Sequence, residues 1–297
     1  MVKPVTKTVV YKSVPVCDIR ADVHWMPGPT RQPAILWLHG GALIFGSRAG
    51  IPAYQLGAFL RAGYTVISAD YRLAPQVKLE AIIEDLRDAY AWTRSDGPRL
   101  FSIDPERIAV MGQSAGAYLT LVTGYAVTPR PRALVSFYGY GDLTGAWYSQ
   151  PSPYYCDHPA VARDDAYRAV GHDVLSEGRH EDRSPFYLYC RQHGLWPLEV
   201  TGHDPQEEAD WFAHFCPVRN VTGDYPPTLL IHGDVDTDVP YELSVMMDAE
   251  LERRQAAHEF LTLHGRGHAF DHAADAEHDP VIRQTLDKVL VFLSQHV

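Results

Sequence analysis

The segment RIAVMGQSAG, residues 107–116, gives the strongest indication of the fold. Its first six residues form a compact apolar run ending in glycine, which is typical of a strand buried on both faces. Apolar residues at helical spacing follow from Tyr118 to Tyr125. A serine in a G-x-S-x-G pattern between a strand and a helix sits in a tight turn that exposes its hydroxyl. Ser114 is therefore predicted to be a nucleophile rather than a helix cap.

Outward from this stretch, apolar runs and helical stripes alternate. The runs predicted to be buried strands cover residues 34–41, 64–72, 107–112, 132–140, 228–233 and 259–265. Residues 5–14 and 17–25 are predicted to form an edge hairpin, because the second alternates strictly between apolar and polar side chains. Helices are expected from Leu79 to Asp96, after Ser114 and at the carboxyl end. The pattern predicts an α/β fold with a mostly parallel sheet of about eight strands and helices on both faces.

The alternation breaks between Gly141 and Tyr225. This stretch contains many turn-forming prolines and glycines and a high density of aromatic residues. We therefore predict a core in two parts, residues 1–143 and 223–297, with an inserted lid at 144–222. The alternative is a long excursion packed for stability alone.

An activated serine needs a general base, and the base needs a carboxylate that orients it. Two segments that directly follow predicted strands supply both. The run from Asp234 to Pro240 follows TLLIHG, and His268 follows EFLTLHG. Asp234, Asp236 and Asp238 compete for the role of the acid. The chain order of serine, aspartate and histidine is the one expected of an α/β-hydrolase.

Negative charge develops on the substrate's carbonyl oxygen during acyl transfer, so hydrogen-bond donors must face that oxygen. Gly40, Gly41 and Ala42 come directly after the strand that begins at residue 34 and are placed to offer backbone N–H groups. The N–H of Ala115, next to the nucleophile, is expected to join them in an oxyanion hole. An ordinary glycine turn is the alternative.

Two clusters of acidic residues could suggest metal sites, but the spacing of their residues disfavours metal binding. The D-x-D-x-D run at 234–238 opens like a calcium loop, but Val239 and Val245 stand where such a loop needs glycine and glutamate. The histidines and aspartates at 264–279 lack zinc spacing, and a solvated acidic helix is expected there instead. We expect neither a metal nor a cofactor.

Five motifs in this order resemble the hormone-sensitive-lipase-like branch of the α/β-hydrolases, the acetyl esterase and lipase group. They are HGGA at 39–42, DYRLAP at 70–75, GQSAG at 112–116, D-x-x-V-P at 236–240 and Gly267-His268. The resemblance covers the chain from about residue 34 to the carboxyl end, without the lid. It implies an α/β-hydrolase fold and a cofactor-free serine esterase of small acyl esters, with Ser114, Asp236 and His268 as its catalytic triad.

The resemblance also narrows two open assignments. The D-x-x-V-P spacing favours Asp236 as the acid and leaves Asp238 as its main rival. Members of the branch usually carry H-G-G-G, whose second and third glycines donate to the oxyanion. Gly41 and Ala42 take these positions here, and the alanine bears on the width of the adjacent pocket.

The composition and charge of the chain indicate which binding partners and which cellular location to expect. With 37 acidic against 26 basic residues, the net charge is −11, which disfavours nucleic acid and anionic membrane surfaces as partners. Residues 1–14 lack the apolar core of a signal peptide or membrane anchor, so a cytoplasmic location is expected. Cys17, Cys156, Cys190 and Cys216 form no C-x-x-C pair and are expected to be buried free thiols.

The function that these residues favour is a serine carboxylesterase acting on a small-molecule ester of small to medium size. Related bacterial enzymes act on feruloyl esters, formamides or peptides, so an amide-directed hydrolase is the alternative within the enzyme class. A catalytically silent hydrolase fold used as a binding module is the alternative outside it. The sequence leaves open whether the chain forms a homo-oligomer.

Overall fold

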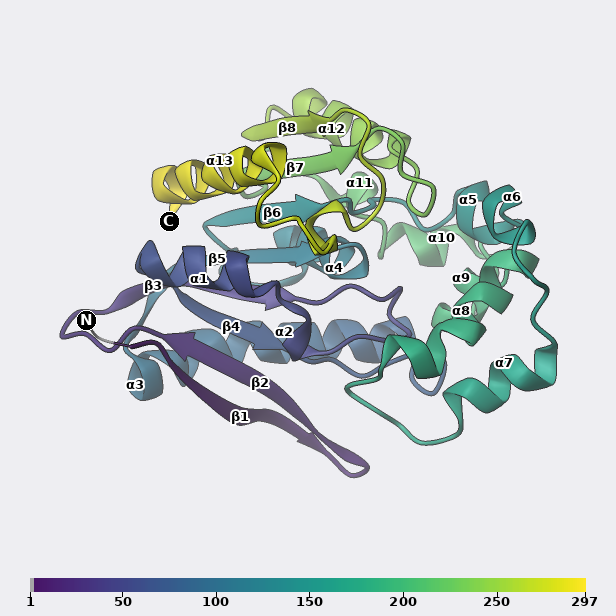
Figure 1. Ribbon diagram of the computed structural model, residues 1–297, viewed down its shortest axis with the longest axis horizontal. Coiled ribbons are helices and arrows are strands. Elements are labelled where there is room, and N and C mark those ends of the chain that lie inside the picture. Colours follow the sequence, from purple (N-terminus) through teal and green to yellow (C-terminus); the bar gives the residue numbers. More distant parts are fainter. Residues whose placement is uncertain (1–2) are drawn as a thin grey trace.

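In the computed structural model, which describes residues 3–297, eight strands form a single mixed sheet (Figure 1). They are β1 (Val5–Val14), β2 (Cys17–Trp25), β3 (Gln32–Leu38), β4 (Thr65–Ala69), β5 (Ile103–Gln113), β6 (Ala133–Phe137), β7 (Thr228–Gly233) and β8 (His258–Leu263). Their order across the sheet is β1-β2-β4-β3-β5-β6-β7-β8. β2 pairs antiparallel with β1 and with β4, and the other neighbouring pairs are parallel. The predicted fold class is confirmed.

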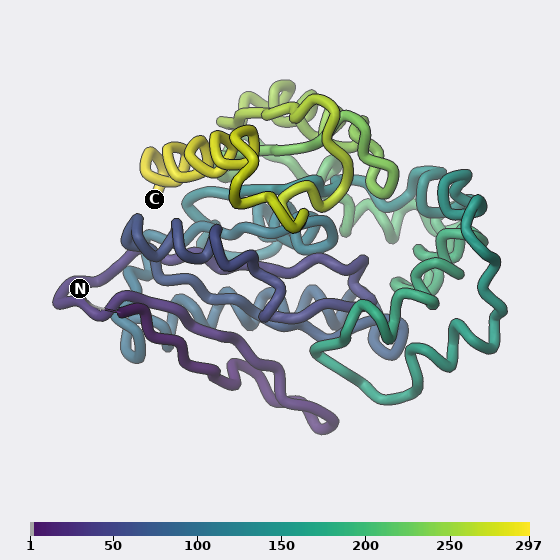
Figure 2. Tube along the Cα trace, in the orientation of Figure 1, coloured from purple at the N-terminus to yellow at the C-terminus, as the bar shows by residue number. Residues whose placement is uncertain are grey.

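Apolar side chains point to both faces of the central strands, which explains why these strands show no alternating pattern. In β3, Ala34, Leu36 and Leu38 belong to one buried cluster, and Ile35 and Trp37 belong to the other. One face is covered by α2 (Leu79–Ser95), α4 (Ala115–Ala126) and α12 (Glu242–Arg253), and the opposite face by α1 (Ala53–Arg61) and α13 (Pro280–His296) (Figures 1 and 2). Burial on both faces requires apolar residues at every position.

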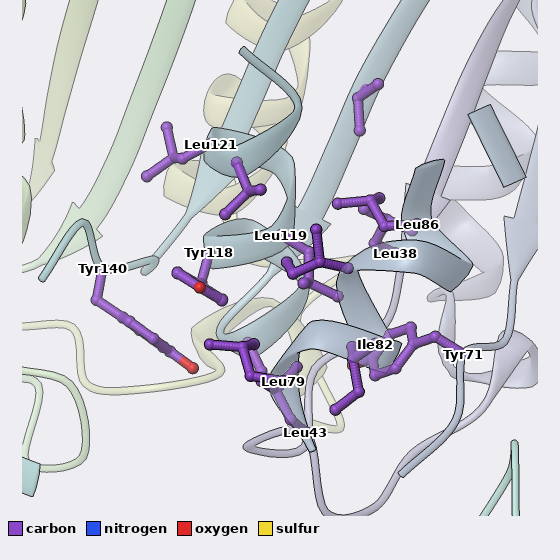
Figure 3. Close-up of a cluster of buried hydrophobic side chains, with 14 of the residues drawn as sticks. Leu38, Leu43, Tyr71, Leu79, Ile82, Leu86, Tyr118, Leu119, Leu121 and Tyr140 are labelled. Atoms are coloured by element: carbon purple, nitrogen blue, oxygen red, sulfur yellow. The ribbon is translucent and has the colours of Figure 1, made fainter. Parts of the chain in front are cut away.

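Three of these helices, α2, α4 and α13, follow the predicted apolar stripes. Leu79, Ile82 and Leu86 of α2 lie beside Tyr118 and Leu119 of α4 in the larger buried cluster (Figure 3). The apolar patterns of the sequence do not predict α1 or α12. Each of these helices buries only four side chains, so its apolar stripe is short.

Seven helices connect β6 to β7 within the described residues. They are α5 (Ala146–Ser149), α6 (Pro153–Cys156), α7 (Arg163–Val170), α8 (His180–His193), α9 (Trp196–Thr201), α10 (Ala209–Ala213) and α11 (Pro217–Asn220). We call residues 144–222 the inserted segment. It lies beyond the carboxyl ends of the parallel strands, on the side opposite both chain ends (Figures 1 and 2). Its boundaries and its role as a lid stay predictions.

Two local expectations are wrong. Residues 264–279 form turns and the 3-10 helix Phe270–His272 instead of a solvated acidic helix. Asp271 is only 1% exposed, and its buried carboxylate is stabilised by hydrogen bonds from amide and hydroxyl groups. Cys190 and Cys216 are buried free thiols as expected. Cys156 is exposed on the short helix α6, and Cys17 is only partly buried near the sheet edge. The two remaining short helices are α3 (Gly97–Phe101) and the 3-10 helix Arg48–Gly50.

Candidate active site

The parallel strands bring the predicted site residues to one edge of the sheet. Gly40 to Ala42 follow β3, Ser114 follows β5, Asp236 follows β7 and His268 follows β8. Because β3, β5, β7 and β8 run in the same direction, the loops after them leave the sheet on the same side. Ligand sites of open α/β sheets lie at this carboxyl edge.

Ser114 occupies the turn between β5 and α4 with φ 53° and ψ −119°, a strained conformation for a residue with a side chain. The flanking glycines make this turn possible. A Cβ added to Gly112 would lie 2.3 Å from the Gly116 carbonyl oxygen, and one added to Gly116 would lie 2.1 Å from that of Leu38. Larger residues at 112 and 116 would therefore disrupt the turn that exposes the serine.

His268 connects Ser114 to Asp236 through its two ring nitrogens. Nε2 lies 3.0 Å from Ser114 Oγ, and Nδ1 lies 2.7 Å from Asp236 Oδ2. A neutral imidazole whose Nδ1–H donates to the carboxylate presents an unprotonated Nε2 to the serine hydroxyl. The structure thus brings together the three residues predicted as a triad, in the arrangement that proton transfer from serine requires.

The carboxylate of Asp236 is held in a dense set of hydrogen bonds. Oδ1 accepts from the backbone N–H groups of Asp238 and Val239 at 2.8 and 2.9 Å. Oδ2 lies 3.1 Å from His232 Nε2 in addition to His268. Burial favours the neutral acid, but the hydrogen bonds from His232 and His268 outweigh burial and lower the pKa of Asp236 below that of free aspartate. Asp236 is therefore a fixed anion.

Neither of the two rival aspartates contacts Nδ1 of His268. Asp234 is at the surface, where its Oδ2 lies 2.8 Å from His264 Nδ1. Asp238 faces the opposite nitrogen of the imidazole, with Oδ2 3.6 Å from His268 Nε2. Of the three, only Asp236 contacts Nδ1 of His268, the nitrogen that an orienting acid must hold.

The carboxylates of Asp236 and Asp238 affect the pKa of His268, the candidate base. Burial disfavours the imidazolium, but the charges of Asp238 and Asp236 outweigh burial and raise the pKa of His268 above that of free histidine. The imidazolium that forms when serine loses its proton is stabilised by the same charges.

The loop after β3 passes directly beside the nucleophile. A Cβ added to Gly40 would lie 3.3 Å from Ser114 Cβ. Gly41, Ala42 and Leu43 adopt positive φ values of 107°, 54° and 63°. In the part of the chain that the structure describes, the N–H groups of Gly41, Ala42 and Ala115 have no hydrogen-bond acceptor, so they are free to bind an oxyanion.

Contacts from the inserted segment hold this loop in place. Trp196 Nε1 donates to the Ala42 carbonyl oxygen at 2.9 Å, and Arg183 Nε donates to that of Ile44 at 2.6 Å. Gly46 and Gly178 exchange two backbone hydrogen bonds of 2.7 and 2.9 Å. The DYRLAP motif supports the loop from the other side, where the Tyr71 hydroxyl donates to the His39 carbonyl oxygen at 2.8 Å.

A cavity of about 760 Å³ opens above Ser114. Gly40, Gly41, Ala42, Asp238 and His268 line it on the side of the sheet edge. Apolar and aromatic side chains, many from the inserted segment, form most of the remaining wall, namely Trp37, Phe45, Tyr138, Tyr155, Val161, Pro185, Tyr187 and Leu188. A pocket of this size accommodates a ligand of small to medium size.

Sequence reasoning missed several residues that support the site. Asp271 accepts hydrogen bonds from Tyr138 at 2.5 Å and from the side chains of Gln55 and Gln113. The ring of Tyr138 packs edge-on against His268, with 4.7 Å between ring centroids. No spacing signal in the sequence distinguishes Asp271 from the exposed aspartates around it.

The described residues contain neither a candidate metal-binding cluster nor a helix suited to span a membrane. Among residues 3–297, no group of three or more His, Cys, Asp or Glu side chains is placed to hold a metal ion. None of the helices in the described part of the chain is both long enough and apolar enough to cross a membrane.

The strand order, the serine turn and the histidine between serine and aspartate define an α/β-hydrolase. Residues 35–272 match the model of the family described as alpha/beta hydrolase fold, and the chain belongs to this family. The match confirms the resemblance to α/β-hydrolases stated from the motifs.

Curated relatives are much longer than this chain. It is 29% identical over 303 residues to the non-reducing polyketide synthase Preu6 of Preussia isomera and 25% identical over 319 residues to methylphloroacetophenone synthase of Cladonia uncialis. Each match covers 89% of this chain, but the chain spans only 14% and 12% of the length of these relatives.

Solved structures share the fold at low identity. Propionate-bound esterase 2 of Thermogutta terrifontis is 20% identical with a TM-score of 0.70, covering 98% of this chain and 94% of that one. The acetyl ester-xyloside bifunctional hydrolase of Caldicellulosiruptor lactoaceticus is 17% identical with a TM-score of 0.72, covering 97% and 96%. At these identities the likeness concerns the fold alone.

Proposed function

We propose that this protein is a serine carboxylesterase that hydrolyses esters of small to medium size. The observation that carries the proposal is the position of His268, which lies 3.0 Å from Ser114 Oγ through one nitrogen and 2.7 Å from Asp236 through the other. This arrangement converts a serine hydroxyl into a nucleophile.

In the first half of the reaction, His268 Nε2 takes the proton of Ser114 as Oγ attacks the ester carbonyl carbon. The N–H groups of Gly41, Ala42 and Ala115 stabilise the negative charge that forms on the carbonyl oxygen, with Gly40 leaving room beside the nucleophile. The tetrahedral intermediate collapses when the bond to the alcohol oxygen breaks, and that oxygen receives the proton from His268.

In the second half, water attacks the acyl group on Ser114 and gives a proton to His268 Nε2. The carboxylic acid then leaves and Ser114 regains its proton. Asp236 keeps its negative charge throughout and fixes the tautomer of His268. The cavity volume of about 760 Å³ supports the predicted substrate size, and the mostly apolar wall suits an uncharged ester rather than an ionic ligand.

A series of nitrophenyl esters with increasing acyl length tests the proposal. We expect turnover of the shorter esters and a fall in kcat/KM once the acyl chain exceeds the cavity. An organophosphonate should label wild-type protein once per chain and leave Ser114→Ala unlabelled. Absence of both turnover and labelling would favour the silent binding module.

The amide-directed alternative is tested with the same protein. We expect formyl-amide and aminoacyl substrates to be hydrolysed far more slowly than esters of the same acyl group. A higher kcat/KM for the amides would replace the ester assignment by the amide assignment while leaving the roles of Ser114, Asp236 and His268 intact.

A further inference from the structure

Asp238 is a second carboxylate at the reacting end of the cavity, and one of its two oxygens is free. Oδ1 accepts hydrogen bonds from the Tyr187 hydroxyl and from Arg191 Nη1, both at 2.5 Å. Among the described residues, no side chain forms a hydrogen bond to Oδ2; His268 Nε2 lies 3.6 Å from it, and the Tyr155 hydroxyl also lies near this carboxylate. Asp238 lines the cavity, and 19% of its side chain is exposed there.

The surroundings determine which kind of ligand Oδ2 can bind. Arg191 is 97% buried within the inserted segment and forms an ion pair with Asp238 that offsets part of its charge. A cationic ligand would meet this guanidinium behind the carboxylate, and an anionic ligand would be repelled by the carboxylate itself. A neutral hydrogen-bond donor is left, and it gains from an acceptor whose lone pairs have no other partner.

The position of Oδ2 indicates where on the substrate the donor must be. The alcohol oxygen of the ester has to approach His268 Nε2 within hydrogen-bond distance to receive its proton. Oδ2 lies 3.6 Å from this nitrogen, on the same cavity wall. Oxygens on adjacent carbons of a diol stand about one hydrogen-bond length apart, so a hydroxyl next to the ester oxygen reaches Oδ2.

We propose that Asp238 Oδ2 accepts a hydrogen bond from a hydroxyl on the carbon next to the esterified carbon of the leaving alcohol. Asp238 is then a specificity-determining residue, and the substrate class is the monoesters of vicinal diols and polyols. The aromatic rings of Tyr155 and Tyr187 beside Asp238 provide the apolar wall for the carbon skeleton of such an alcohol. The inference rests on the proposed esterase function.

Three acetate esters test it on wild-type protein. 2-Hydroxyethyl acetate carries the hydroxyl, propyl acetate has the same number of heavy atoms without it, and 2-methoxyethyl acetate has an oxygen that accepts but cannot donate. We expect kcat/KM for the hydroxyethyl ester to exceed the values for both others by about tenfold or more, the size expected of one hydrogen bond to a charged acceptor.

Asp238→Asn turns the acceptor into a donor. Arg191 and Tyr187 keep the amide oxygen in the place of Oδ1, so the NH2 group takes the place of Oδ2. The hydroxyethyl to methoxyethyl ratio should fall toward one, because the ether oxygen can now accept a hydrogen bond. Asp234→Asn, the same change at the surface of the same loop, should leave the wild-type ratio intact.

The outcomes separate this inference from the proposed function. If wild-type protein hydrolyses all three esters with equal kcat/KM, Asp238 binds no substrate hydroxyl and the inference is wrong, although the esterase assignment stands. If Asp238→Asn slows the three esters by one common factor, the carboxylate acts through His268 or the attacking water, and the inference is again wrong. If no ester is hydrolysed, the proposed function itself fails. The wild-type ratio decides the matter even if the variant does not fold.

Discussion

The sheet edge and the inserted segment contribute to one cavity in different ways. At the sheet edge, the turn around Ser114 and the loop from Gly40 to Ala42 place backbone in conformations that need glycine or tolerate strain, and these needs appear as short motifs. The inserted segment contributes Trp196 and Arg191, which act through side-chain hydrogen bonds over large sequence separations. The reacting groups of the sheet edge leave motifs in the sequence, whereas the residues of the inserted segment that support them do not.

If the sheet edge carries the chemistry, its nucleophile should be indispensable. We predict that Ser114→Ala lowers kcat for a nitrophenyl ester by roughly 10⁴-fold or more, because the acyl-enzyme can no longer form. Steady-state kinetics on folded protein measure the effect. Residual activity above about a tenth of wild type would mean that another group is the nucleophile.

Replacement of the orienting acid should cause the next largest loss of activity. We predict that Asp236→Asn lowers kcat roughly 10³- to 10⁴-fold, because an amide at this position cannot hold the reactive tautomer of His268. Asp238→Asn and Asp234→Asn should each cost under about tenfold on the same ester, since neither side chain contacts Nδ1 of His268. Circular dichroism should accompany the kinetics, because a destabilised variant can mimic a catalytic defect. If Asp238→Asn lost most of its kcat while Asp236→Asn kept nearly all of it, the orienting acid would be Asp238 instead of Asp236.

Much of the sheet could be predicted from the sequence, because a strand buried on both faces must be apolar throughout. Each of the eight strands lies where an apolar run or an alternating pattern predicts it, within a few residues. The helices α2 and α4 were predicted for a similar reason. The helix α12 buries only Leu243, Ser244, Met247 and Leu251, too few to mark it in the sequence.

The residues of the candidate site also differ in whether the sequence predicts them. Ser114, His268 and the loop at Gly40 to Ala42 could be predicted because each directly follows a strand at one sheet edge. Asp236 could not be separated from Asp238 by the residues alone, since both lie in one loop and only its folded path decides which meets Nδ1. Trp196 belongs to the aromatic-rich stretch, but nothing in the sequence marks it as the donor to Ala42, because a buried tryptophan is most often core.

The inserted segment should matter less than the sheet edge, but measurably. We predict that Trp196→Phe lowers kcat about tenfold with little change in KM. The change removes the donor to the Ala42 carbonyl while a ring remains to stack on Tyr148, 4.0 Å away between centroids. Loss of a whole oxyanion-hole donor costs about 10²- to 10³-fold, so a loosened loop should cost less.

Trp211→Phe is the matched control for this prediction. Trp211 belongs to the same segment but stacks on His203 and does not line the cavity. We expect its kcat to stay near wild type. Equal losses in the two variants would show that the segment acts through general stability rather than through the loop at Ala42.

The smallest effect concerns the pH dependence, where the two regions meet at Asp238. His268 must be neutral to take the proton of Ser114, so kcat/KM falls as the pH drops through the pKa of His268. Asp238 helps to raise this pKa above that of free histidine, against the opposing effect of burial. Asp238→Asn removes that charge, so the pKa should fall and the acidic limb of the pH profile should move to lower pH. Profiles of kcat/KM measured at one ionic strength for wild type, Asp238→Asn and Asp234→Asn test this shift. An acidic limb that stays in place in Asp238→Asn would show that the charge of Asp238 does not set the protonation of His268, and that Asp236 and Asp271 outweigh burial without it.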